Sequence, residues 1–114
     1  MNHLHPVNLL ALANSAKLGK YISAGHLNGH MLNVLQVSNR TLDFHIHEKS
    51  DELFYVIEGT FEIETDDGLT EVKQGEIIII PKGRRHRPVV KETVKCLLIE
   101  LDGTLTAENT GGTY

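Results

Sequence analysis

Short apolar runs separated by turn residues make up most of the chain after residue 30. In the run Phe61-Glu62-Ile63-Glu64, apolar and acidic residues alternate, which puts the apolar side chains on one face of a strand and the carboxylates on the other. The runs predict strands at 31–37, 41–47, 53–57, 60–65, 69–72, 76–80, 86–90 and 94–101. Many short strands with turn residues between them are typical of a β-sandwich or barrel.

The chain before residue 25 has a different pattern. Residues 7–16 are rich in Leu and Ala and predict one short helix that ends before Gly19. We therefore expect one all-β domain over residues 1–114, with an N-terminal arm and short helix at 1–24, a barrel at 25–101 and a C-terminal tail at 102–114. The tail has little apolar content, so we expect it to be loosely held.

Residues 77–80 are four consecutive isoleucines, which predicts a strand covered on both faces. One barrel wall buries only its inner face, so a second element must cover the outside. We expect a second subunit to do so in a homodimer. The alternative is cover by the helix predicted at 7–16.

Charge and composition exclude several classes of partner. The formal net charge is −4, and acidic and basic residues are interspersed, so no broad cationic surface is available for nucleic acid. The apolar runs are too short to cross a membrane, and the N-terminus lacks the pattern of a signal peptide, so we expect a cytoplasmic protein. The single cysteine, Cys96, excludes a disulfide within the chain.

Three histidines and one glutamate form a candidate metal site. His45 and His47 lie two apart in a predicted strand, so their side chains leave the same face, about 6.6 Å apart along the backbone. Glu52 follows after a turn, and His86 begins another predicted strand. A His-X-His pair alone is a weak indication, because a strand histidine is more often a surface or hydrogen-bonded residue. The full set suits a divalent transition metal (zinc, iron, nickel, manganese, cobalt or copper) better than calcium or magnesium.

The spacing around these residues resembles the two motifs of the cupin superfamily. The first motif is matched by His45-Ile46-His47, four residues, Glu52, six residues and Gly59; the second by Gly75, five residues, Pro81-Lys82-Gly83, two residues and His86. Asn39 and Val90 stand where the family has a leading glycine and a closing asparagine. The resemblance implies a small single-domain jelly-roll barrel that binds one metal on His45, His47, Glu52 and His86, near one end of its cavity.

Strand alternation predicts which side chains line a pocket around this metal. If Glu52 and His86 face inward, their strands and the last strand contribute Phe54, Val56, Pro88, Val90, Cys96 and Leu98. A largely apolar cup with one polar end is typical of a small-molecule site. Cys96 is either a sulfur ligand or a small packing residue, and the second interpretation is favoured. Arg84 is a candidate for attracting an anionic group, whereas alternation directs Arg85 and Arg87 away from the metal.

The resemblance implies a metal-dependent enzyme of isomerase, lyase, decarboxylase or dioxygenase type. We therefore expect an enzyme that acts on a small polar molecule, but the sequence identifies no general base beyond the ligands, and the catalytic residues stay unknown. The alternative is a non-catalytic module that binds or senses a small-molecule ligand with a bound metal. A third possibility is a barrel that keeps the ligands but binds little metal.

Overall fold

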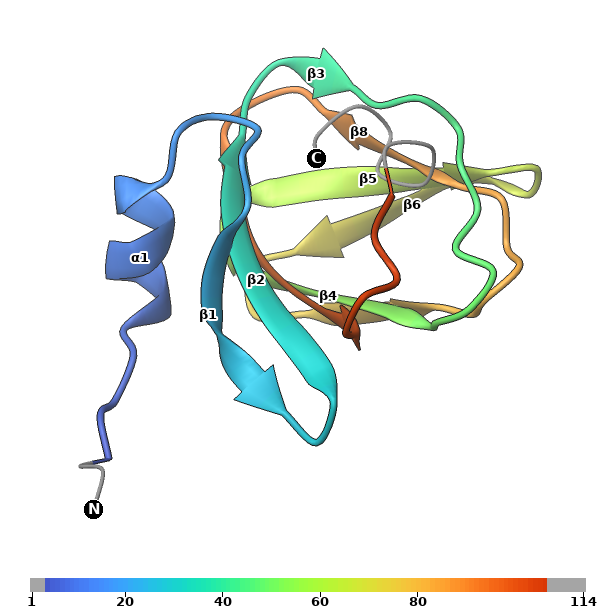
Figure 1. Cartoon of the computed structure of the whole chain (residues 1–114). Helices are drawn as coiled ribbons and strands as arrows, with labels where there is room; N and C mark the ends of the chain where they lie inside the picture. The colour runs from blue at the N-terminus through green and yellow to red at the C-terminus, as the bar shows by residue number, and fades with distance from the viewer. Residues whose placement is uncertain (1–3, 107–114) are drawn as a thin grey trace.

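The structure, a computed structural model that describes residues 4–106, consists of two antiparallel sheets that face each other across an apolar core (Figure 1). Its elements are α1 (Leu9–Ser15), β1 (Ile22–Leu27), β2 (His30–Val37), β3 (Arg40–Thr41), β4 (Glu52–Glu58), β5 (Thr60–Thr65), β6 (Gly68–Lys73), β7 (Ile77–Ile80), β8 (Arg87–Val90) and β9 (Val94–Leu101). One sheet has the order β1-β2-β9-β4-β7 and the other β3-β8-β5-β6. This arrangement confirms the predicted all-β jelly-roll with a short N-terminal helix.

The strand predicted at 41–47 forms only at its start, as β3. Beyond Thr41 the backbone stays next to β8, its partner in the same sheet, through the Leu42 amide, which donates to the Pro88 carbonyl (3.0 Å), and through one bridge between His45 and His86. Burial still alternates along this segment, since His45 and His47 are buried while Ile46 between them reaches the surface. Both histidines therefore point to the same, inner side, as predicted, although a regular ladder does not hold them.

β1 is a strand that the sequence reading missed. Ser23 and Gly25 interrupt its apolar pattern, and the register against β2 shifts between these two residues. Asn28 and Gly29, both with positive φ (49° and 77°), form the tight turn into β2. An Asn-Gly pair is a strong hairpin signal, and it would have predicted this strand.

The helix packs on the outer face of the five-stranded sheet. Its first turn is capped by Asn8, whose side chain accepts a hydrogen bond from the Ala11 amide (2.9 Å). Ala13 is fully buried against Val34 and Leu97 of the sheet. The helix contacts β1, β2, β9 and β4. Figure 1 shows it beside β1 and β2.

The isoleucine run forms the edge strand β7, and the prediction that it is covered on both faces is wrong for the single chain. Ile78 and Ile80 face the core, but Ile77 and Ile79 are 57% and 56% exposed. The alternative of cover by α1 is also wrong, because the helix lies over the other strands of the sheet. A second subunit stays a prediction.

Two turns at motif positions have a residue with positive φ. Gly59 has φ +94°, and a Cβ at this position would lie 2.7 Å from the carbonyl oxygen of Thr93, so the turn requires glycine. Asn39 stands where the motif has glycine and has φ 47°. Asparagine adopts this region more readily than most residues, so the departure preserves the turn. Val90, in place of the closing asparagine, is buried in the core.

The described residues just after β9 are held to the β1–β2 turn. The Asp102 amide donates to the carbonyl of Gly29 (2.8 Å), which ties this segment to the β1–β2 turn. Of the predicted tail, residues 107–114 lie outside the described residues. Within residues 4–106, no helix is long and apolar enough to cross a bilayer.

Candidate metal centre

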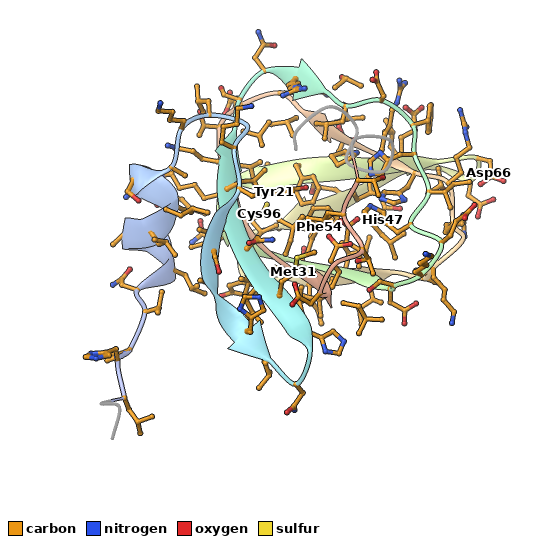
Figure 2. The ribbon with its side chains drawn as sticks, in the orientation of Figure 1. Tyr21, Met31, His47, Phe54, Asp66 and Cys96 are labelled. Carbon is orange, nitrogen blue, oxygen red and sulfur yellow. The ribbon has the colours of Figure 1, made fainter. Side chains whose placement is uncertain are left out.

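The four predicted metal ligands converge inside the barrel. His45 and His47 come from the segment after β3, Glu52 begins β4, and His86 directly precedes β8. One possible ligand atom from each residue lies within 4.8 Å of the other three, and all four side chains are buried. Figure 2 shows His47 in the space between the two sheets. The structure therefore brings together four side chains from three separate segments.

Backbone hydrogen bonds hold these segments in place. His45 and His86 each donate an amide to the other's carbonyl (3.0 and 3.1 Å), and the Gly83 amide donates to the carbonyl of His47 (2.8 Å). The loop between the ligands is fixed as well, because the Lys82 amide donates to the Asp51 carboxylate (2.9 Å). The two motifs are thus joined at the ligands themselves, which limits how far the imidazoles can move.

Carbonyl groups set the tautomers of two ligands. Nδ1 of His45 donates to the carbonyl of Asp43 (2.7 Å), and Nδ1 of His86 donates to that of Arg84 (2.9 Å). A carbonyl can only accept, so Nδ1 carries the hydrogen in both rings and Nε2 of each neutral ring presents a lone pair. Both Nε2 atoms are therefore available to a metal.

The remaining contacts test whether a metal fits. Nε2 of His86 lies 3.1 Å from Oε1 of Glu52, and Nε2 of His47 lies 3.4 Å from Oε2. A lone pair that faces a carboxylate at this distance needs a proton or a cation between the two atoms. Both ring nitrogens of His47 are buried without a well-aligned hydrogen bond among the described residues. A cation between the imidazoles and Glu52 satisfies these atoms, so the donor set fits a transition metal.

Burial and nearby charges shift the pKa values of His45 and His47 in opposite directions. Burial lowers the pKa of His45, which favours the neutral ring that a metal requires. Burial also acts to lower the pKa of His47, but the contact with Glu100 and the charges of Glu52 and Glu100 outweigh it and raise that pKa. Burial is also the main cause that raises the pKa of Glu100.

An apolar cavity of about 30 Å³ lies beside His45 and Glu52. Five of the predicted pocket residues line it, namely Phe54, Pro88, Val90, Cys96 and Leu98, together with Tyr21 and Leu42, which the sequence did not predict. Val56 is buried in the same core but does not line the cavity. The space accommodates a group of about the size of one or two waters.

Cys96 occupies a packing position on the inner face of β9. It lies in the apolar core, and burial raises the pKa of its thiol to about 12. A thiol that stays protonated is a poor metal ligand. Cys96 is also outside the cluster of candidate ligands, which supports the packing interpretation.

Arg84, contrary to the prediction, does not line the cavity. Its guanidinium donates to Asp67 (2.8 Å) and Asp66 (3.5 Å) at the β5–β6 turn, where Figure 2 labels Asp66. Two carboxylates therefore neutralise the charge that was expected to attract an anion. Arg85 and Arg87 stack on the ring of Phe44 (3.8 and 4.2 Å to its centre) rather than pointing to the metal site.

A second and larger pocket, of about 330 Å³, borders His47 on the outside of the barrel. Its lining mixes polar and apolar surface and comes from two segments: Ile46, His47, Glu48, Lys49, Gly103, Thr104 and Thr106. We call this space the outer pocket. It is large enough for a small molecule, and it touches one of the four candidate ligands.

Glu100 is the residue of the site that the sequence reading missed. It lies on the inner face of β9, where Val94, Cys96 and Leu98 also face the core, and only 2% of it is exposed. Extending the predicted alternation by one step would have placed Glu100 inside the barrel. The inward position of an acidic residue in this alternation is therefore the sequence signal that could have identified Glu100.

Comparison with known proteins gives the same result for the family. A family model described as "Cupin domain" matches residues 32–106. The chain is 42% identical over 82 residues to the uncharacterized protein YdbB of Bacillus subtilis (strain 168), over 70% of this chain and 72% of that protein. The crystal structure of a cupin-2 domain containing protein from Shewanella frigidimarina has a TM-score of 0.78 at 28% identity and covers 83% of this chain and 93% of its own. Protein NMB1881 from Neisseria meningitidis has a TM-score of 0.76 at 23% identity, over 86% of this chain and 100% of that one. The fold, the motif spacing and these matches together show that the chain belongs to the cupin family.

Proposed function

We propose that the protein binds one divalent transition metal on His45, His47, Glu52 and His86 and uses it to act on a small polar molecule. The observation that supports this most directly is the opposition of imidazole lone pairs and the Glu52 carboxylate at 3.1 and 3.4 Å. Such an arrangement is stabilised by a cation, and it is unfavourable when no cation or proton lies between the atoms. The ligand set leaves positions of an octahedral ion open to a ligand.

The metal, when bound, would act as a Lewis acid on a carbonyl or hydroxyl oxygen of the substrate. The chain's own residues hold and surround it. His45 and His86 are held by backbone carbonyls, so their Nε2 atoms are preorganised. Phe54, Leu98 and the other apolar side chains of the inner cavity keep water away, which strengthens the electrostatic interactions there.

The outer pocket is the space we propose for the substrate. Glu48, Lys49 and Thr104 supply polar groups along its walls, and His47 connects it to the metal centre. A lining with these polar groups suits a small molecule with several hydrogen-bonding groups. The apolar inner cavity offers such a molecule no comparable set of partners.

One observation favours a non-catalytic module that binds or senses a small ligand with a bound metal. The inner cavity beside His45 and Glu52 holds only about 30 Å³, which leaves little room for a substrate to react on that side. A screen that finds tight, metal-dependent binding without product formation would support this function.

Elemental analysis of protein purified without added metal tests the proposal. We expect about one transition-metal ion per chain, and strong depletion in the His86→Ala variant. Incubation of the metal-loaded protein with small acids, diols and sugars then separates the reaction types, because an oxygenase consumes dioxygen whereas an isomerase or lyase does not. A metal content near zero in the wild type, also after incubation with zinc, iron, nickel, manganese, cobalt and copper, would contradict the proposal.

We also propose a homodimer, because the outer face of the five-stranded sheet exposes apolar residues. Ile77 and Ile79 of β7 are more than half exposed, and the half-buried Leu53 and Ile99 adjoin them on β4 and β9. An apolar surface of this kind is typical of a protein–protein interface. Light scattering on the pure protein measures the mass and tests the dimer.

A further inference from the structure

A second buried carboxylate lies directly behind the candidate metal centre. Glu100 is 2% exposed, and its Oε2 lies 3.0 Å from Nδ1 of His47. In the register of β4 against β9, Leu53 faces Ile99, so the next pair inward along the two strands is Glu52 and Glu100. The carboxylate therefore contacts one candidate ligand and lies beside another.

The three imidazoles differ in what faces their Nδ1 atoms. For His45 and His86 the acceptor is a backbone carbonyl two residues earlier in the chain. For His47 it is the side chain of Glu100, which comes from a distant strand. A side-chain carboxylate carries a full charge, so it polarises the imidazole more strongly than a carbonyl does.

The contact between His47 and Glu100 is close but imperfectly aligned. At 3.0 Å the two atoms are within hydrogen-bonding distance, yet the N–H direction misses the oxygen, and Oε2 makes no other well-aligned hydrogen bond among the described residues. Any rotation of the imidazole that aligned the donor would also move Nε2 relative to Glu52. The orientation of His47 and its contact with Glu100 are therefore linked.

We propose that Glu100 is the positioning residue for His47: its carboxylate accepts the Nδ1 hydrogen, selects the tautomer with a free Nε2, and so sets how tightly the site holds its metal. This inference rests on the proposed metal-binding function. Ligating histidines characteristically donate their second ring nitrogen to a carboxylate or carbonyl, and loss of that partner typically weakens metal binding by about 10- to 100-fold.

The tautomer can be measured without any metal. We would record the ring ¹⁵N chemical shifts of His47 in metal-free wild-type protein at about pH 8.5, well above the ordinary histidine pKa. The proposal predicts that Nδ1, which faces Glu100, carries a hydrogen, whatever Nε2 carries toward Glu52 in the absence of metal. An Nδ1 without a hydrogen in the wild type would overturn it, and this result does not depend on the stability of any variant.

Metal affinity provides the second test, with zinc as the probe in competition with a chromophoric chelator. We expect Glu100→Gln to bind zinc about 10- to 100-fold more weakly than the wild type, and Glu100→Asp to recover part of the loss because it keeps the charge. Glu71→Gln removes the same charge from an exposed position on β6 and serves as the matched control, with unchanged affinity. Circular dichroism verifies that each variant is folded.

The two levels of inference fail in different ways. If the wild type binds no zinc or other transition metal, the proposed function is wrong, while the tautomer measurement still decides the role of Glu100. If the wild type binds zinc and Glu100→Gln binds it within twofold of the wild type, the metal site stands and the positioning role of Glu100 is refuted.

Discussion

Replacing His86 with alanine should abolish most of the metal-induced rise in melting temperature. His86 is completely buried, and its Nε2 faces Glu52 at 3.1 Å. The substitution removes one of four candidate ligands and leaves the Glu52 carboxylate without this contact. A metal that binds the native state alone stabilises it by mass action, so the loss of affinity appears directly as a smaller thermal shift.

The size of the effect follows from the chain length and the binding equilibrium. At a free metal concentration 100 times Kd, binding stabilises the wild type by about 2.7 kcal/mol. For 114 residues at about 2.1 cal/mol/K each, the unfolding entropy is about 0.24 kcal/mol/K, so the melting temperature rises by about 11 °C. If the variant binds about 100-fold more weakly, the same metal adds only about 0.4 kcal/mol, or under about 2 °C.

Differential scanning calorimetry of metal-free and metal-loaded protein measures both shifts. His26→Ala is the matched control, because His26 is an exposed histidine on β1, outside the cluster, and this variant should show the full wild-type shift. An equal shift in His86→Ala and the wild type would refute the assignment of His86 as a ligand.

Three further predictions concern the turn, the outer face and protonation. Gly59→Ala should lower the free energy of unfolding, measured in urea, by more than about 2 kcal/mol. Positive φ costs an L-residue roughly 1–2 kcal/mol, and the new Cβ would also clash with the Thr93 carbonyl. An unchanged urea midpoint of unfolding would contradict this argument. Ile79→Lys should convert the proposed dimer to a monomer in light scattering, since it puts a charge in the exposed apolar face, and an unchanged mass would count against that interface. As the pH is lowered, zinc affinity should begin to fall above pH 6.5, because the raised pKa of His47 lets protons compete with the metal there. His45, whose pKa is lowered, should add a second loss of affinity only below pH 6.5. An affinity that does not change between pH 8 and pH 5 would be incompatible with imidazole ligands.

The sequence predicted the four candidate ligands because each one lies at a position where local backbone geometry determines the direction of its side chain. His45 and His47 share a face through two-residue alternation, and this alternation survives where the regular strand does not. His86 follows a turn at Gly83 and is bridged to His45. The local alternation of residues and the motif spacing therefore both predicted that these side chains lie inside the barrel.

What the sequence could not supply depends on contacts between distant segments. The neutralisation of Arg84 requires the β5–β6 turn to lie next to it, which no local pattern around residue 84 indicates. The exposure of Ile77 and Ile79 follows from the position of β7 at the sheet edge, whereas four consecutive isoleucines suggest a central strand. Glu100 is the intermediate case, since its inward direction was predictable but its contact with His47 was not.

Anomalous scattering from a crystal of the protein soaked in zinc tests the central claim most directly. The account predicts one peak inside the barrel, about 2.0–2.1 Å from a ring nitrogen of each of His45, His47 and His86 and about 2.0–2.2 Å from an oxygen of Glu52. An interior without a peak, or zinc bound only elsewhere while these imidazoles keep their places, would contradict it.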